Sequence, residues 1–162
     1  MKKLSTLLLV AGFSVAGLTH AAGYGVVDMQ RVVESSTYLK QQNTSLQSAV
    51  KPSADRVEQL NKDIQALQAK ASSAKPAEVA QLKTQYDTKV REINSLEQNI
   101  QQRVQTTSQT TSQTFTARVQ QAAEQLRKEG NLDFVLNKNS ALAYDAKNDL
   151  TDKMIQKVNT MK

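Results

Sequence analysis

The side chains that could catalyse a reaction are few and scattered along this chain. It has no cysteine, and its one histidine, His20, lies in the N-terminal apolar segment. It also lacks the Gly-x-Ser-x-Gly motif of hydrolases and the glycine-rich loop that binds phosphates. Carboxylates are dispersed along the chain. Asp28 fits a helix cap better than a catalytic base. Tyr86 fits a packed aromatic residue better than a catalytic phenol. We therefore expect no enzyme activity, no metal site and no cofactor.

Three lysines are the clearest candidate binding group, because clustered positive charge attracts anionic partners. Residues 64–86 contain Lys70, Lys75 and Lys83 against the single acidic residue Glu78, a local net charge of +2. The whole chain carries a formal net charge of +6. This segment is only weakly basic, and the basic balance of the whole chain favours anionic partners such as phospholipid, lipopolysaccharide or acidic protein segments. The alternative is that the lysines only keep exposed helices soluble.

One long stretch without glycine must position these residues. Val26 to Glu129 is 104 residues long and rich in Gln, Lys, Ala, Glu and Leu, which lose little free energy on entering a helix. Its apolar residues alternate at spacings of three and four, which is typical of a helix that pairs with another helix. The predicted seam comprises Leu39, Leu46, Val50, Val57, Leu60, Ile64, Leu67 and Ala71, then Val79, Leu82, Tyr86, Ile93, Leu96 and Ile100, and further on Phe115, Val119, Ala122 and Leu126.

The two halves of this seam are separated by residues 71–76, which read Ala-Ser-Ser-Ala-Lys-Pro. Small polar residues followed by a proline favour a turn, so we predict an antiparallel helical hairpin whose arm projects by roughly 60 Å. The alternative is one unbroken helix in a parallel coiled coil, which Pro76 argues against. The heptad pattern continues through Pro52, so we expect a kink or surface adjustment in a continuing helix there, with a short break as the alternative.

The N-terminus has the pattern of a secretory signal. Lys2 and Lys3 precede an apolar run from Leu4 to Leu18, and small residues allow cleavage after Ala21. A transmembrane anchor is the alternative, but it needs about 20 apolar residues and this run is shorter. Cleavage removes Lys2 and Lys3 and lowers the formal net charge from +6 to +4. The exported mature protein lies in a compartment without ATP, where nucleic acid is not an expected partner.

Residues 106–116 form a low-complexity tract of threonine, serine and glutamine with a four-residue repeat. Threonine and serine are mediocre helix formers, so the second half of the hairpin should be softest here. We favour a flexible, solvated helix face. A hydroxyl-lined surface facing a wet environment is the functional alternative.

Both ends of the mature chain predict short elements. We expect a strand ending at Asp28, which caps a short helix, and a cap at Ser36 or Thr37 for the first arm helix. Gly130 should end the second arm helix as a left-handed cap. A β-hairpin of 132–136 and 141–144 and a terminal helix capped by Thr151 should follow, with Leu150 and Ile155 packing across its start.

These ends should form a small body of 22–35 and 130–162, joined to an arm of 36–129 whose tip lies near 72–76. An apolar fraction of 39% with 4% aromatics is low for a compact domain, so the body core should be thin and marginal alone. We expect self-association through strand edges to compensate. The candidate core residues are Val26, Val27, Phe134, Val135, Leu136, Leu142 and Tyr144.

Two stretches, together with the order of elements, resemble the Skp/OmpH family of periplasmic chaperones. The first is Gly25-Val26-Val27-Asp28-Met29, and the second runs from Leu132-Asp133-Phe134-Val135-Leu136 through Ala143-Tyr144 to Asp149-Leu150-Thr151. The resemblance implies a mostly α, α+β fold, in which a long helical hairpin is attached to a small β-containing trimerisation body. It also implies a homotrimer whose arms surround a central cavity.

The same resemblance implies a function. Proteins of this family hold unfolded outer-membrane β-barrel proteins, their clients, during transit across the periplasm without ATP. Anionic lipid headgroups or lipopolysaccharide are further partners to test, and the lysines at the tip are candidate contacts for clients or anions. The alternative function is a structural coiled-coil adaptor or spacer of the cell envelope, which would bind one dedicated partner with one-to-one stoichiometry.

Overall fold

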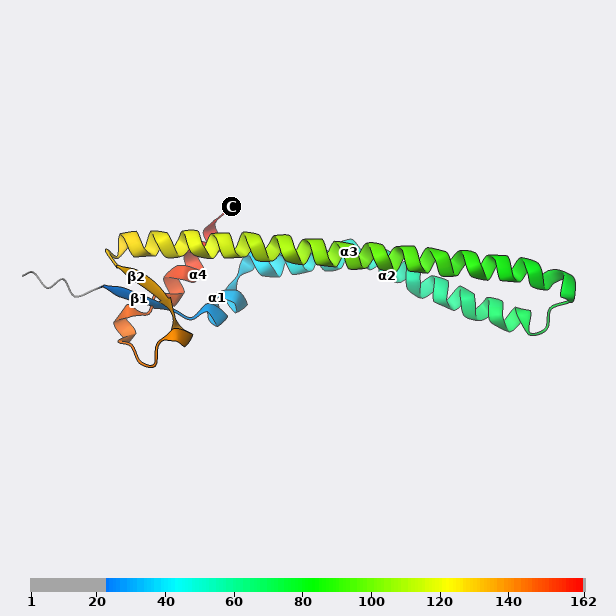
Figure 1. Ribbon diagram of the computed structural model, residues 1–162, viewed down its shortest axis with the longest axis horizontal. Coiled ribbons are helices and arrows are strands. Elements are labelled where there is room, and N and C mark those ends of the chain that lie inside the picture. Colours follow the sequence, from blue (N-terminus) through cyan, green and yellow to red (C-terminus); the bar gives the residue numbers. More distant parts are fainter. Residues whose placement is uncertain (1–22, 162) are drawn as a thin grey trace, which may run out of the picture.

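Two long helices dominate the computed structural model, which describes residues 23–161. Helix α2 spans Thr37–Ala71 and helix α3 spans Pro76–Glu129, and they lie side by side with the connecting turn at the far end of the molecule (Figure 1). At 1.5 Å per residue, α3 is about 80 Å long. The predicted helical hairpin is confirmed. The predicted signal peptide, residues 1–21, lies outside the described residues.

The remaining elements gather at the other end of the hairpin (Figure 1). They are strand β1 (Tyr24–Val27), helix α1 (Met29–Ser35), strand β2 (Phe134–Asn137), two 3-10 turns, η1 (Lys138–Ser140) and η2 (Ala146–Asn148), and helix α4 (Thr151–Thr160). Strands β1 and β2 pair in parallel, with Tyr24 opposite Phe134 and Val27 opposite Asn137. The parallel pairing brings the two ends of the chain together.

The predicted β-hairpin is wrong. Residues 141–144 form no strand, and the neighbour of β2 is β1. The side chain of Asn137 accepts a hydrogen bond from the Asn139 N–H and starts the turn η1, which leads the chain away from β2. Ala141 and Ala143 have low strand propensity, and Leu142 is fully exposed, so packing does not favour a strand in this segment.

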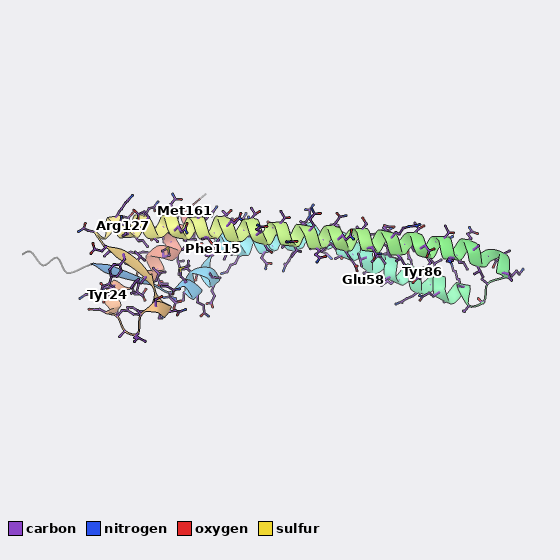
Figure 2. All side chains as sticks on the ribbon, viewed as in Figure 1. Tyr24, Glu58, Tyr86, Phe115, Arg127 and Met161 are labelled. Atoms are coloured by element: carbon purple, nitrogen blue, oxygen red, sulfur yellow. The ribbon has the colours of Figure 1, made fainter. Side chains whose placement is uncertain are left out.

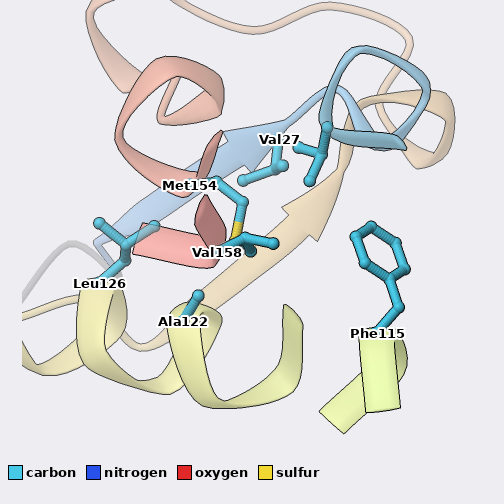
Figure 3. Packing of buried hydrophobic residues seen from close by; sticks show 7 residues of the cluster. Val27, Phe115, Ala122, Leu126, Met154 and Val158 are labelled. Carbon is cyan, nitrogen blue, oxygen red and sulfur yellow. The ribbon is translucent and has the colours of Figure 1, made fainter. Parts of the chain in front are cut away.

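The core lies where α3 passes over α4, α1 and β1. Buried side chains from all four elements form one cluster, part of which is visible in Figure 3: Val27, Val32, Phe115, Ala122, Leu126, Met154 and Val158. Three of these residues belong to α3, which the sequence analysis assigns to the arm. The core therefore uses the last turns of the arm helix as well as the chain ends.

The helix starts agree with the expected capping, with one exception. Asp28 caps α1 by accepting a hydrogen bond from the Arg31 N–H, and Ser36 caps α2 by accepting one from the Leu39 N–H. Thr151, however, is the first residue of α4 and not its cap. Its hydroxyl accepts a hydrogen bond from the Asp28 N–H at 2.9 Å, so it joins α4 to the end of β1.

The end of α3 also differs from the expectation. Gly130 has a φ of −86°, and the left-handed residue is Asn131, with a φ of 48°. Asparagine tolerates this conformation. Gly130 is required for a different reason, because a Cβ at this position would lie 2.9 Å from the Leu132 Cγ.

Pro52 lies inside α2, which continues without a break on both sides. This confirms the prediction of a continuous helix. The Pro52 side chain is exposed.

Candidate functional site

The surface between α2 and α3 holds most of the predicted seam. Leu60, Leu67 and Ile93 are buried, and most other seam residues are half-buried. Val79 departs from the pattern, since its side chain is 44% exposed close to the turn. Sparse apolar residues on each helix therefore bury only a narrow stripe, and the rest of the arm surface is exposed to solvent.

Residues 56–63 and 89–93 face each other across the seam, and we name this part of the arm the arm waist. Two ion pairs cross between the helices here. The Arg56 Nε lies 2.8 Å from Glu92 Oε1, and the Lys89 Nζ lies 2.7 Å from Asp63 Oδ2. Between them Leu60 is completely buried. The waist fixes the register of the antiparallel pair, because both ion pairs require the helices to stay aligned.

Two adjoining cavities separate α2 from α3 between the waist and the body, and we name them together the arm crevice. The larger cavity, about 640 Å³, is lined among others by Val50, Ser53, Ile100, Arg103, Thr106 and Thr107. The smaller cavity, about 330 Å³, is lined among others by Leu39, Asn43, Leu46, Thr107, Thr111 and Phe115. Thr107 lines both cavities. No aspartate or glutamate lines either cavity.

The threonine and serine tract explains this crevice. Thr107, Thr111 and Phe115 recur every four residues and therefore share one face of α3. Thr107 and Thr111 are half-buried, and Phe115 is buried. Phe115 lies nearest the body, as Figure 2 shows for its position on α3. Thr107 and Thr111 have shorter side chains than Leu46, which lines the same cavity, so part of the space between the helices stays unfilled. Most other residues of the tract are exposed, in keeping with the favoured solvated helix face, while Thr107 and Thr111 line the cavities towards α2.

The three predicted lysines lie at the distal end of the arm. Lys70 is in the last turn of α2, Lys75 occupies the position just before α3, and Lys83 lines a cavity of about 250 Å³ between the helices. All three side chains are exposed. The walls of this tip cavity are mostly apolar and include Leu67, Ala71, Val79, Leu82 and Tyr86. The tip therefore combines an apolar recess with positive charge.

The candidate body residues divide between two environments. Val26 and Val27 are buried, and Val135 is half-buried against the core cluster. Phe134 and Leu136, which alternate with Val135, point to the opposite face of the sheet and are 41% and 37% exposed.

The Tyr24 ring extends this second face, and Leu142 and Tyr144 lie in the irregular segment between η1 and η2. The Tyr24 ring stacks on the ring of Phe134, with 6.4 Å between centroids. Tyr144 is half-buried, and Leu142 is fully exposed. Within residues 23–161, β2 pairs with no strand other than β1, so an apolar face and a free strand edge lie next to each other.

The root of the arm is held by contacts that the sequence analysis did not identify. The Arg118 guanidinium lies over the Tyr38 ring, 4.2 Å from its centroid, and donates a hydrogen bond to the Met161 carbonyl at 2.8 Å. The Asn159 Oδ1 accepts a hydrogen bond from the Thr37 N–H at 2.9 Å, and its Nδ2 donates to the Ser35 carbonyl. Both arm helices are thereby tied to α4. The Thr151, Met154 and Val158 spacing could have indicated that α4 packs on the core.

A polar network joins the end of β1 to the segment after β2. The Lys138 Nζ lies 3.1 Å from Asp28 Oδ2, and Tyr144 and the Thr151 N–H both donate hydrogen bonds to Asp149. Hydrogen bonds from the Arg31 N–H and from Lys138 lower the pKa of Asp28. Hydrogen bonds from the hydroxyl and N–H of Thr151 lower the pKa of Asp149, and Asp28 raises the pKa of Lys138.

No group of three or more histidine, cysteine or acidic residues within residues 23–161 could hold a metal ion. No helix in the same range is both long enough and apolar enough to cross a bilayer.

These features define a class of protein in which a long helical hairpin projects from a small α+β body and presents its surfaces to partners. The chain belongs to the OmpH-like outer membrane protein family, whose match covers residues 23–158. No curated protein sequence matches the chain. Among solved structures, it resembles a protein of Caulobacter crescentus CB15 described as an OmpH-like outer membrane chaperone. The TM-score is 0.64 at 17% identity, over 86% of this chain and 85% of that one, which supports the fold.

Proposed function

We propose that the mature chain is an ATP-independent holdase of the periplasm, which keeps unfolded outer-membrane β-barrel proteins from aggregating. The observation that carries this proposal is the projecting arm. A 54-residue helix extends far beyond the body that anchors it, and its shallow cavities suit many loosely bound segments. Membership of the OmpH-like family and the name of the Caulobacter crescentus neighbour support a chaperone role.

The proposal includes self-association into a homotrimer through the body, residues 22–35 and 130–162. Phe134 and Leu136 leave apolar side chains exposed on β2, which pairs only with β1 within residues 23–161, and Leu142 is fully exposed in the segment that follows. Pairing of strand edges between copies would bury these side chains and satisfy the backbone groups. Three arms held together would then supply many weak contacts, which raise affinity without requiring a specific client sequence.

The arm, residues 36–129, would contact clients, and its tip near 72–76 would carry the charge that attracts them. Lys70, Lys75 and Lys83 are exposed and available to acidic client segments. The same lysines are our candidates for contact with anionic lipid headgroups or lipopolysaccharide. Sedimentation with vesicles that contain or lack anionic phospholipid tests this part of the proposal separately.

An aggregation assay tests the holdase function. Two unrelated β-barrel proteins and one soluble protein are diluted from urea with and without stoichiometric mature trimer, and light scattering follows aggregation. We expect both β-barrel clients to stay soluble. If neither client stays soluble, the holdase proposal is wrong. Protection of one client at a one-to-one ratio of chains would instead favour a dedicated adaptor or spacer.

A further inference from the structure

The arm crevice contains one positive charge whose partner is not found in the described chain. Arg103 lines the larger cavity, and its side chain makes no ion pair or hydrogen bond within residues 23–161. The nearby arginine at the waist is different, because Arg56 is paired with Glu92. No carboxylate lines the cavity beside Arg103. The crevice can therefore receive a negative charge without competition from its own lining.

The remaining lining is suited to a polypeptide backbone. Ser53, Asn99, Gln102 and Thr106 supply hydroxyl and amide groups that both donate and accept hydrogen bonds. An extended backbone offers alternating N–H and C=O groups that can pair with them. A lipid acyl chain could satisfy none of these groups, and leaving polar groups without partners in a filled cavity costs free energy.

The dimensions of the crevice indicate how much chain it could hold. Its lining on α2 extends from Leu39 to Ser53, which corresponds to roughly 21 Å along the helix axis. An extended strand rises about 3.3 Å per residue, so this length accommodates about six residues. Leu46, Val50 and Ile100 are half-buried and offer apolar contacts along the same path.

We propose that the arm crevice binds an extended segment of unfolded polypeptide, about six residues long, that carries a carboxylate for Arg103 and apolar side chains for Val50 and Ile100. This inference rests on the proposed function, because it identifies where on the arm a client segment binds. It assigns client contact to the space between the two helices of one arm, near the body and far from the lysines at the tip.

The test measures binding of a labelled peptide by fluorescence anisotropy to full-length mature protein. The probe has an extended sequence with one aspartate among valines and serines, and its counterpart carries lysine in place of the aspartate. We expect Arg103→Glu to weaken binding of the acidic peptide about tenfold, as loss of a charged hydrogen bond implies, and to strengthen binding of the lysine peptide. Arg91→Glu is the matched control, since it makes the same charge change on α3 outside the crevice.

Circular dichroism checks that both variants keep their helices, which we expect because both arginines are exposed. Equal effects of Arg103→Glu and Arg91→Glu on peptide binding would overturn the proposal, as general electrostatics would then explain them. A loss of vesicle binding in Arg103→Glu without any change in peptide binding would also overturn it, in favour of a lipid.

A second measurement separates this inference from the proposed function. The chain has no natural cysteine, so Thr107→Cys can carry a photoreactive crosslinker at the centre of the crevice, with the exposed Ser48→Cys as control. We expect an unfolded β-barrel client to crosslink at position 107 several-fold more than at position 48. If clients stay soluble but crosslink equally at both positions, the holdase function stands and the crevice assignment is wrong.

Discussion

At the scale of single residues, the side chains that matter most join distant segments of the chain. Arg118 contacts an aromatic ring on α2 and the carbonyl of Met161 after α4, so one guanidinium connects three parts of the structure. Its planar group can stack and donate at the same time, which a lysine cannot do in the same way. Such residues position the arm although they lie far from its tip.

We predict that Arg118→Ala lowers the free energy of unfolding by about 1–3 kcal/mol, through loss of the cation–π contact and the hydrogen bond to Met161. Arg118→Lys should recover only part of this loss. Urea denaturation followed by circular dichroism measures the change. Arg103→Ala on the same helix serves as control and should change stability by less than about 0.5 kcal/mol. Equal losses for the two alanine variants would contradict the assigned role of Arg118.

The polar network around Asp28 predicts a dependence of stability on pH. The pKa values of Asp28 and Asp149 are lowered in the folded protein, so both carboxylates stabilise it at neutral pH and lose this effect as the pH falls below about 4. The raised pKa of Lys138 keeps its charge present throughout this range. The free energy of unfolding should therefore decrease between pH 4 and pH 2.

Asp28→Asn should flatten this decrease, because asparagine still caps α1 but carries no charge to lose. Denaturation curves at several pH values measure the effect. Asp55→Asn, on the exposed face of α2, is the control and should keep the pH dependence of the unaltered protein. If the free energy of unfolding of Asp28→Asn falls with pH as steeply as that of the control, another group determines stability in acid.

At the scale of elements, the two arm helices combine a tight waist with a loose region nearer the body. The waist has large apolar side chains and two ion pairs between helices. The crevice has short hydroxyl side chains where a seam would need large ones. The same two helices therefore pack well or poorly according to side-chain volume, while the backbone remains helical throughout.

We predict that Leu60→Ala destabilises the protein by about 3 kcal/mol, since Leu60 is completely buried and its loss leaves a cavity at the waist. Val79→Ala is the matched control at the exposed end of the seam and should cost less than about 1 kcal/mol. Both values come from urea denaturation. Similar losses in the free energy of unfolding for the two variants would show that packing at the waist contributes no more than packing at the exposed end of the seam.

Substitution of Pro52 tests for a gain in stability rather than a loss. Pro52 lies within α2, where proline lacks the N–H of the helical hydrogen bond, yet it is exposed and fills no packing role. Pro52→Ala should raise the free energy of unfolding, by at most about 3 kcal/mol, and leave helicity unchanged or higher. Thermal denaturation measures this. A destabilised variant would indicate that the proline sets a bend on which the pairing with α3 depends.

At the scale of the whole molecule, the main core lies in the body at one end (Figure 1, Figure 3). The cavities lie along the arm. The core cluster is small, and the apolar face of the sheet beside it is exposed. A protein of this shape has little apolar surface buried per residue, so association through the body would add stability. This is the basis of the proposed homotrimer.

We predict that Leu142→Asp lowers the molar mass of the mature protein in solution, from three chains to one chain of about 16 kDa. The side chain is fully exposed in the single chain, so the substitution should not disturb the fold itself. Light scattering measures the mass and circular dichroism checks the fold. Val33→Asp, another exposed apolar residue outside β2, is the control. A monomeric unaltered protein would contradict both the trimer and this role of Leu142.

The sequence determined the long helices, the turn between them, the caps at Asp28 and Ser36 and the narrow seam. These features depend on residue type and spacing over a few turns, and helix formation is governed by such local preferences. The family resemblance was also visible, because two short stretches carry it.

Only the tertiary structure decided how the chain ends meet. The pairing of β2 with β1 rather than with 141–144, the use of Phe115 and Leu126 in the body core, and the contacts of Arg118 all join segments far apart in the sequence. The arm crevice is a similar case, since its volume depends on which short side chains of α3 face α2. Local propensity does not encode such pairings, because they are selected by packing and hydrogen bonding in three dimensions.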